Sequence, residues 1–198
     1  MTHNAAAGSV RLRLYTLDDC AAEEANPETP ENSRFSFFGF SSSDRLRQAV
    51  ASGDAHPKLG HFGGQLAVEA DGEFIGSVSW HPVHHGPIGS PATNFGIGLI
   101  PSARGKGYGT EAQRLLVAYL FQNTTVNRVE ASTDVENIAE QRSLEKAGLQ
   151  LEGVAPGAHF REGKYNDLAV YAITRADFEE ARAAANGTKV TTGFTASR

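Results

Sequence analysis

Apolar and polar residues alternate along several short stretches of the chain, and this alternation predicts β-strands. The clearest stretch surrounds Asp71-Gly72, where a two-residue Asp-Gly turn between alternating runs is the strongest short hairpin signal. The pattern predicts strands at residues 10–16, 64–70, 73–83, 93–101, 127–133, 149–160 and 163–174.

Apolar residues recur at three- and four-residue intervals between these strands, which predicts amphipathic helices. The longest predicted helix, 107–123, carries one apolar face made of Ala112, Leu115, Leu116, Tyr119 and Leu120. Helices are also predicted at 19–25, with Asp18 as N-cap, at 43–53, at 136–148, which ends at Gly148, and from Arg175 onward.

The order of these elements is β, α, α, β, β, β, α, β, α, β, β. It predicts an α/β (α+β) fold with a mixed, mostly antiparallel sheet of about seven strands flanked by helices. A chain of 198 residues, 40% of them hydrophobic, can bury one core. We therefore expect a flexible N-terminus at 1–9, one domain at 10–174, and a C-terminal helix with a flexible tail at 175–198.

Composition excludes several classes of protein. The sequence has no run of about 18 apolar residues, and its polar start lacks the apolar core of a signal peptide, so we expect a cytoplasmic protein without membrane contact. The single cysteine, Cys20, excludes an internal disulfide and a multi-cysteine metal site. A net charge of -5 argues against nucleic acid as the bulk partner. We expect a monomer or a homodimer.

Residues 98–114 (GLIPSARGKGYGTEAQR) join a predicted strand to a helix through a basic, glycine-rich turn. Such a turn is suited to an anion, but it is not a P-loop, because Gly107 follows Lys106 where serine or threonine is required. A dinucleotide fingerprint is an alternative: Gly107, Gly109 and Ala112 have its spacing, and Glu130 follows at about 20 residues. Residues 101–104 intervene before the glycines, and this argues against the fingerprint, whose first glycine follows its strand almost at once.

A third interpretation takes Arg104, Gly107 and Gly109 as an Arg-x-x-Gly-x-Gly loop that opens a helix. The helix N-terminus offers unpaired amides and a positive dipole end to a diphosphate, and glycines let the phosphates approach. This loop resembles the acyl-coenzyme A loop of the GCN5-related N-acetyltransferases. Residues 137–154 (NIAEQRSLEKAGLQLEGV) resemble the RimJ/RimL-type branch of that family. The resemblance covers residues 10–174.

The resemblance implies a binding site for acetyl-coenzyme A as acyl donor. The strand end at Leu99, Ile100 and Pro101 would pair with the pantetheine arm, and Asn137 would reach the same arm. Arg142 would contact the coenzyme further out. The remaining implied ligands of the donor, through their amides or charge, are Arg104, Gly105, Lys106, Gly107, Tyr108, Gly109 and Thr110. Asn137 as a plain helix N-cap and Arg142 as a solvated side chain stay open as alternatives.

The family's reaction, direct attack of an amine on the thioester, requires a base. Glu130 is the candidate base, acting through a water molecule, with a solvent-facing strand glutamate as the alternative. Glu140 stands where the branch often has a serine near the thiol. An ionised carboxylate cannot donate a hydrogen bond to a departing thiolate. We therefore expect Glu140 to assist deprotonation or bind the ammonium group, or else to point elsewhere.

The acceptor pocket is expected between a Phe-rich segment, the loop after Trp80 and the last hairpin. Its candidate residues are Phe38, Phe40, Trp80, His81 and Tyr165. The His-Pro-Val-His-His run does not complete a zinc site, because no cysteine or carboxylate constellation accompanies it, and we expect no metal.

These observations together predict an acetyl-coenzyme A-dependent N-acetyltransferase that acts on a primary amine of a small molecule or a protein N-terminus. Two alternatives remain open. One is a non-catalytic acyl-coenzyme A-binding or sensing domain, and the other is an acyltransferase with a different acyl donor.

Overall fold

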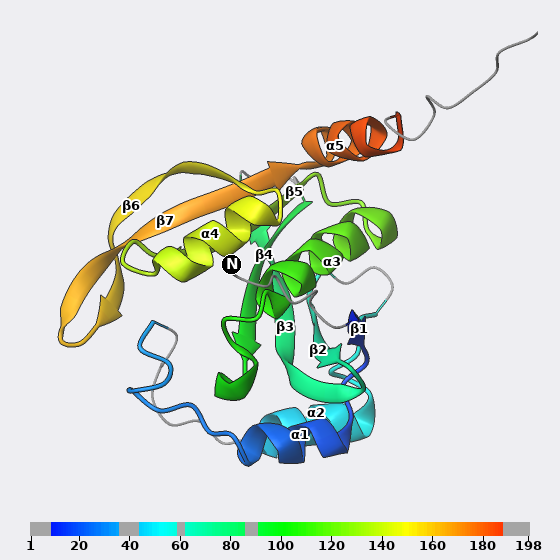
Figure 1. Cartoon of the computed structure of the whole chain (residues 1–198), viewed down its shortest axis with the longest axis vertical. Helices are drawn as coiled ribbons and strands as arrows, with labels where there is room; N and C mark the ends of the chain where they lie inside the picture. Colours follow the sequence, from blue (N-terminus) through cyan, green and yellow to red (C-terminus); the bar gives the residue numbers. More distant parts are fainter. Residues whose placement is uncertain (1–8, 36–43, 59–61, 86–90, 188–198) are drawn as a thin grey trace, which may run out of the picture.

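The computed structural model describes residues 9–35, 44–58, 62–85 and 91–187, which form one seven-stranded sheet and its flanking helices (Figure 1). The strands are β1 (Val10–Arg13), β2 (Gly64–Ala70), β3 (Glu73–His84), β4 (Pro91–Leu99), β5 (Arg128–Asp134), β6 (Gln150–Arg161) and β7 (Lys164–Thr174). The helices are α1 (Leu17–Glu24), α2 (Asp44–Ser52), α3 (Tyr108–Asn123), α4 (Ile138–Lys146) and α5 (Arg175–Gly187), with a short 3-10 turn η1 at Pro101–Ala103. The element order is the predicted one.

The strands lie in the order β1-β2-β3-β4-β5-β7-β6. All neighbours are antiparallel except β4 and β5, which run parallel. This arrangement confirms the predicted mixed, mostly antiparallel sheet. It also removes the dinucleotide-binding alternative, because that fold needs repeated parallel strands joined by crossover helices.

The β2–β3 hairpin forms at the predicted turn. Asp71 and Gly72 have φ angles of 54 and 88 degrees, as a turn with two left-handed central residues requires. The start of α1 differs from the prediction: Thr16, not Asp18, is its N-cap. The Thr16 side chain accepts from the Asp19 amide, and the Asp19 carboxylate accepts from the Thr16 amide. This reciprocal pair fixes the first turn two residues earlier than predicted.

The main core lies between one face of the sheet and helices α3 and α4, which both lie in front of the sheet in Figure 1. Leu116, Leu120 and Leu144 are fully buried there against Val78 and Phe95. Each such side chain stabilises the fold by about 1.5 to 3 kcal/mol. Leu115 and Tyr119, predicted on the same face of α3, are only half-buried.

A smaller cluster covers the opposite face of the sheet at its β1–β3 half. It joins α1 and α2 to β2 through Tyr15, Cys20, Val50 and Ala67. No helix of the described ranges covers the β5–β7 half of that face, and β6 and β7 continue as a long curved hairpin beyond it (Figure 1). Among the described residues, no helix has both the length and the apolar character to cross a membrane.

Candidate functional site

A wedge opens between β4 and β5, the parallel neighbours. The two strands pair over three residue pairs, of which Asn94 with Glu130 is the last. Beyond that point β4 stays paired with β3, and β5 stays paired with β7. The facing edges of Phe95–Leu99 and Ala131–Asp134 therefore have no partner strand in the described sheet. Such edges are templates for an extended, amide-bearing chain.

Alternate residues of β4 turn their backbone groups toward the wedge. The Ile100 amide donates to the Ile75 carbonyl, and the Ile100 carbonyl accepts from the Ala103 amide, each at 3.0 Å. Ile100 therefore faces β3 and η1. Because the facing side alternates along an antiparallel strand, Ile97 and Leu99 turn their backbone groups to the wedge. Of the two strand-end residues expected at the coenzyme, Leu99 turns its backbone groups to the wedge and Ile100 does not.

The glycine-rich loop ends at the open N-terminus of α3. Gly107 is the N-cap with a φ angle of 84 degrees, and no side chain caps the helix. The first intrahelical bond runs from the Glu111 amide to the Gly107 carbonyl (3.2 Å). The amides of Tyr108, Gly109 and Thr110 precede any partner within the helix. A helix start with free amides and no capping side chain is suited to bind a phosphate.

Arg104 and Lys106 contribute differently to this loop. The Arg104 guanidinium donates to the carbonyls of Leu99 (2.8 Å) and Asn32 and to the hydroxyl of Ser33 (3.3 Å). The Arg104 side chain therefore holds the segment around Asn32 and the end of β4, and its backbone amide donates to the Pro101 carbonyl (3.3 Å). The Lys106 side chain is exposed beside the helix start and supplies the mobile positive charge.

The segment 26–35, called the strap below, links the two sides of the wedge. At one end it is held by Arg104, which follows β4. At the other end Arg34 forms ion pairs with Glu136 (3.2 Å), which follows β5, and with Glu162 (3.0 Å) in the β6–β7 turn. The strap therefore crosses the wide end of the wedge.

Asn137 and Arg142 occupy different environments on α4. The side-chain oxygen of Asn137 accepts from the backbone amide of Glu140 (3.3 Å), and the side-chain nitrogen of Asn137 donates to the Thr133 hydroxyl (3.0 Å). Asn137 is therefore an N-cap that is also tied to β5, at the edge of the wedge. Arg142 is exposed on the outer side of α4.

Glu140 lies between α4 and α3. Its carboxylate accepts a hydrogen bond from the Gln113 side chain (2.6 Å). Burial between the helices raises the pKa of Glu140 to about 7, and the bond from Gln113 offsets part of that rise. The carboxylate is therefore engaged at the interface of α3 and α4.

Glu130 belongs to a row of polar residues on the sheet face opposite α3 and α4. The register places His81 beside Asn94, and Asn94 beside Glu130. Glu130 is 6% exposed, and its carboxylate accepts from Arg128 and from Nε2 of His85. The last paired position of the wedge thus carries a buried carboxylate in contact with a half-exposed histidine. His81 is exposed in the same row.

Trp80 does not lie in an acceptor pocket. It is 4% exposed in the main core, and its ring packs on Tyr119 at 5.7 Å between ring centroids. Successive residues of a strand face opposite sides of the sheet, so Trp80 points away from the face that carries His81.

Tyr165 is the remaining predicted acceptor residue that the described part of the chain includes. Tyr165 is 72% exposed near the tip of the β6–β7 hairpin, where it packs edge-on against Phe160 (5.3 Å). Phe38 and Phe40 lie outside the described residues.

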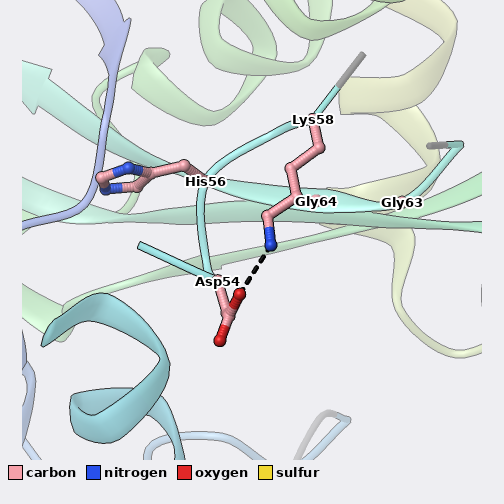
Figure 2. A pocket seen from close by; sticks show the side chains of 5 residues that line it. All are labelled: Asp54, His56, Lys58, Gly63 and Gly64. Atoms are coloured by element: carbon pink, nitrogen blue, oxygen red, sulfur yellow. Dashed lines mark hydrogen bonds and ion pairs between the residues drawn. The ribbon is translucent and has the colours of Figure 1, made fainter. Parts of the chain in front are cut away.

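A separate cavity of about 320 Å³ lies between the end of α2 and the start of β2 (Figure 2). The Lys58 ammonium points to the Asp54 carboxylate across its mouth, at 2.6 Å, while His56 points away. Gly64 pairs with Trp80, at the opposite end of β3 from Leu99 and the glycine-rich loop. The cavity is therefore distinct from the wedge. The described ranges contain no group of three or more His, Cys, Asp or Glu side chains placed to hold a metal ion.

Three polar residues were not among the predicted site residues: Asn94 beside the wedge, and Gln113 and Ser143 between α3 and α4. His85 belongs to the run after Trp80 that was expected to line the acceptor pocket. Gln113 is the one with a sequence signal, because it interrupts the apolar face of the helix yet is 0% exposed. A buried polar side chain requires a partner. The partners, Glu140 and Ser143, lie on another helix and have no local signature.

Known proteins resemble this chain in sequence and in fold. "Probable N-acetyltransferase YjcK" of Bacillus subtilis (strain 168) is 35% identical over 120 residues, which span 61% of this chain and 64% of that protein. RimJ of Mycobacterium smegmatis, solved in complex with CoA-disulfide, matches with a TM-score of 0.73 at 22% identity, over 91% of this chain and 90% of the other. The spermidine N-acetyltransferase of Vibrio cholerae, solved with CoA and spermine, matches with a TM-score of 0.72 at 20% identity. The match covers 86% of this chain and 98% of the other.

The likeness to RimJ and to the spermidine N-acetyltransferase is a likeness of fold. The sequence comparison is decisive at the level of the family: residues 9–150 match the acetyltransferase (GNAT) domain. Taken with the wedge and the open start of α3, this match shows that the chain belongs to the GNAT acetyltransferase family.

Proposed function

We propose that this protein is an acetyl-coenzyme A-dependent N-acetyltransferase that moves an acetyl group to a primary amine of a small molecule or a protein N-terminus. The observation that carries the proposal is the unpaired wedge between β4 and β5, which leads to the open N-terminus of α3. Relatives solved with coenzyme A, and in one case with spermine, support the same donor and an amine acceptor.

Each part of the donor has a complementary surface. The amides of the pantetheine arm would pair with the free edge of β4 at Ile97 and Leu99, as an added strand does. The diphosphate would lie at the amides from Gly105 to Thr110, with Lys106 adding charge. Asn137, at the rim of the wedge, would face the pantetheine arm. No metal is required by this arrangement.

The acetyl group would then lie near the point where β4 and β5 separate, next to Glu130. The amine nitrogen attacks the thioester carbonyl carbon, the carbon–sulfur bond breaks, and the coenzyme leaves as a thiolate that is later protonated by solvent. With the Nε2 hydrogen of His85 donated to Glu130, the Nδ1 lone pair of His85 is free to accept the proton that the amine loses. Glu130 then orients the histidine, and Arg128 holds Glu130.

Binding of coenzyme A tests the donor site without knowledge of the acceptor. We expect the wild-type protein to bind coenzyme A in a calorimetric titration and Gly107→Val to raise the Kd by about tenfold or more, the loss of one or two charge-assisted hydrogen bonds. The valine disfavours the left-handed N-cap and covers the free amides. Gly72→Val is the matched control, because Gly72 has a similar φ angle of 88 degrees and open space around it, but lies in the β2–β3 turn.

Turnover tests the reaction itself. Acetyl-coenzyme A is incubated with peptides that carry free N-termini and with polyamines, and the released thiol is measured; Cys20 is 1% exposed and contributes little to the signal. Release that depends on an amine supports the proposal. Tight coenzyme binding without release for any amine would instead indicate a non-catalytic binding domain, and release from a longer acyl-coenzyme A alone would indicate a different donor.

A further inference from the structure

The helices α3 and α4 are joined by a chain of four polar side chains. The Thr110 and Ser143 hydroxyls are 2.9 Å apart, Ser143 donates to the Gln113 carbonyl oxygen (3.0 Å), and the Gln113 amide nitrogen donates to Glu140 (2.6 Å). Thr110 is the third residue of α3, so one end of the chain lies in the proposed phosphate site and the other end is a carboxylate.

The direction of the hydrogen bonds in this chain follows from which groups can donate and which can accept. An ionised Glu140 only accepts hydrogen bonds, so Gln113 must turn its amide nitrogen toward it and its carbonyl oxygen toward Ser143. The single hydroxyl hydrogen of Ser143 is then used on Gln113, and the Thr110 hydroxyl must donate to Ser143. While Glu140 is ionised, the Thr110 hydroxyl hydrogen is therefore not available to a phosphate.

A protonated Glu140 permits the opposite direction. The carboxylic acid donates to the Gln113 oxygen, the turned Gln113 amide donates to Ser143, and Ser143 donates to Thr110. Every member stays satisfied, and the Thr110 hydroxyl hydrogen becomes free. Gln113 is 0% exposed, so water cannot substitute for it in either arrangement.

We infer that Glu140 is a positioning residue whose protonation state decides, through Gln113 and Ser143, whether Thr110 can donate to a phosphate bound at the first turn of α3. This inference rests on the proposed coenzyme A site. It predicts that ionisation of Glu140 weakens coenzyme A binding.

Glu140 is the ionisable member of the hydrogen-bond chain, and the other charged groups on the two helices lie outside it. On α3, Arg114 pairs with Glu111 (2.5 Å). On α4, Glu145 accepts from Tyr171 (3.4 Å), and Arg142 and Lys146 are exposed. Burial places the pKa of Glu140 at about 7, so the two directions of the chain exchange near neutral pH.

The experiment compares the Kd of coenzyme A for the wild-type protein and Glu140→Gln between pH 5.5 and pH 8.5. Glutamine has the same shape and does not ionise. We divide the Kd of the wild-type protein by the Kd of Glu140→Gln. The titration of the coenzyme's own phosphates affects both values equally and cancels in this ratio. We expect a ratio near one at low pH that rises to about fivefold at high pH, at the lower end of typical coupling between sites, with a midpoint near pH 7. A ratio that stays constant across this range overturns the inference.

Ser143→Ala separates the hydrogen-bond chain from a simple charge effect. It removes the link to Thr110 but keeps the bond between Gln113 and Glu140. In the Ser143→Ala background the ratio should become independent of pH, whereas a ratio that still rises would mean that the charge of Glu140 acts through space and the chain does not. Glu145→Gln, an exposed carboxylate on the same helix, should leave the wild-type pH dependence unchanged. Failure of the wild-type protein itself to bind coenzyme A would contradict the proposed function instead.

Discussion

At the scale of single residues, the proposed proton transfer depends on His85, whose ring contacts Glu130. His85→Gln removes the Nδ1 lone pair that would accept the proton. We expect kcat/KM for the amine to fall about 100-fold, the lower range for general-base assistance, with the KM for acetyl-coenzyme A unchanged. Steady-state rates with varied amine and varied acetyl-coenzyme A measure both constants.

His84→Gln is the control for this prediction, because His84 is the exposed histidine next to His85 in sequence, at the end of β3. If His85→Gln keeps the wild-type kcat/KM but Glu130→Gln loses it, the carboxylate itself is the base. That outcome would restore the simpler assignment that the sequence suggests.

At the scale of elements, the two ends of α3 differ in how their backbone groups are hydrogen-bonded. Its N-terminus is open, whereas at its C-terminal end the Arg175 guanidinium donates to the carbonyls of Phe121 (2.7 Å), Thr124 (2.9 Å) and Val126 (2.8 Å). A cation at this end also complements the helix dipole. Arg175→Ala should lower the free energy of unfolding by about 1.5 to 3 kcal/mol, the range for hydrogen bonds of a charged group.

Urea denaturation of Arg175→Ala and of Arg182→Ala tests this prediction. Arg182 is exposed on the same helix, α5, and its replacement should change the free energy of unfolding by less than about 0.5 kcal/mol, as is usual for surface sites. Equal effects of both replacements would mean that α3 does not depend on the cap.

At the scale of the whole molecule, a charge cluster joins the strap, the end of β5 and the β6–β7 hairpin. Arg161 donates to Asp134 (3.0 Å), whose side chain is 0% exposed, and to Glu136 (2.9 Å). Arg161→Ala would leave the buried Asp134 carboxylate with the Glu136 amide (2.9 Å) and the His159 ring (3.6 Å) as partners but without its guanidinium, and should cost about 3 to 5 kcal/mol. Arg34→Ala removes a cation that is 49% exposed and should cost less than about 1 kcal/mol. Urea unfolding measures both.

The pH dependence of stability provides a second readout for this cluster. Burial alone would raise the pKa of Asp134, but the Glu136 amide and the Arg161 guanidinium together hold it below its ordinary value of 3.8. The stability from this group is therefore present above pH 3.8 and is lost as the pH falls through the lower, folded-state pKa. Arg161→Ala should remove this acid-dependent loss. An unchanged acid limb in the variant would contradict the assignment.

The sequence by itself determined the order of the elements, the Asp71-Gly72 hairpin and the glycine-rich start of α3. These features depend on consecutive residues, because side-chain periodicity, turn chemistry and helix starts are local. It also predicted the family, since the Arg104 to Gly109 loop and the helix opened by Asn137 are contiguous motifs. The core face of α3 was predicted in large part for the same reason.

Only the tertiary structure decided which side chains meet. Trp80 and His81 are neighbours in sequence, yet the strand pairing sends one to the core and the other to the open face, and a shift of one residue would exchange them. Glu140 contacts Gln113 because α3 and α4 pack side by side, 27 positions apart in the chain. The wedge itself depends on the point at which two strands stop pairing. Contacts between distant segments have no local signature, so the acceptor side of the site was the part that sequence patterns predicted least.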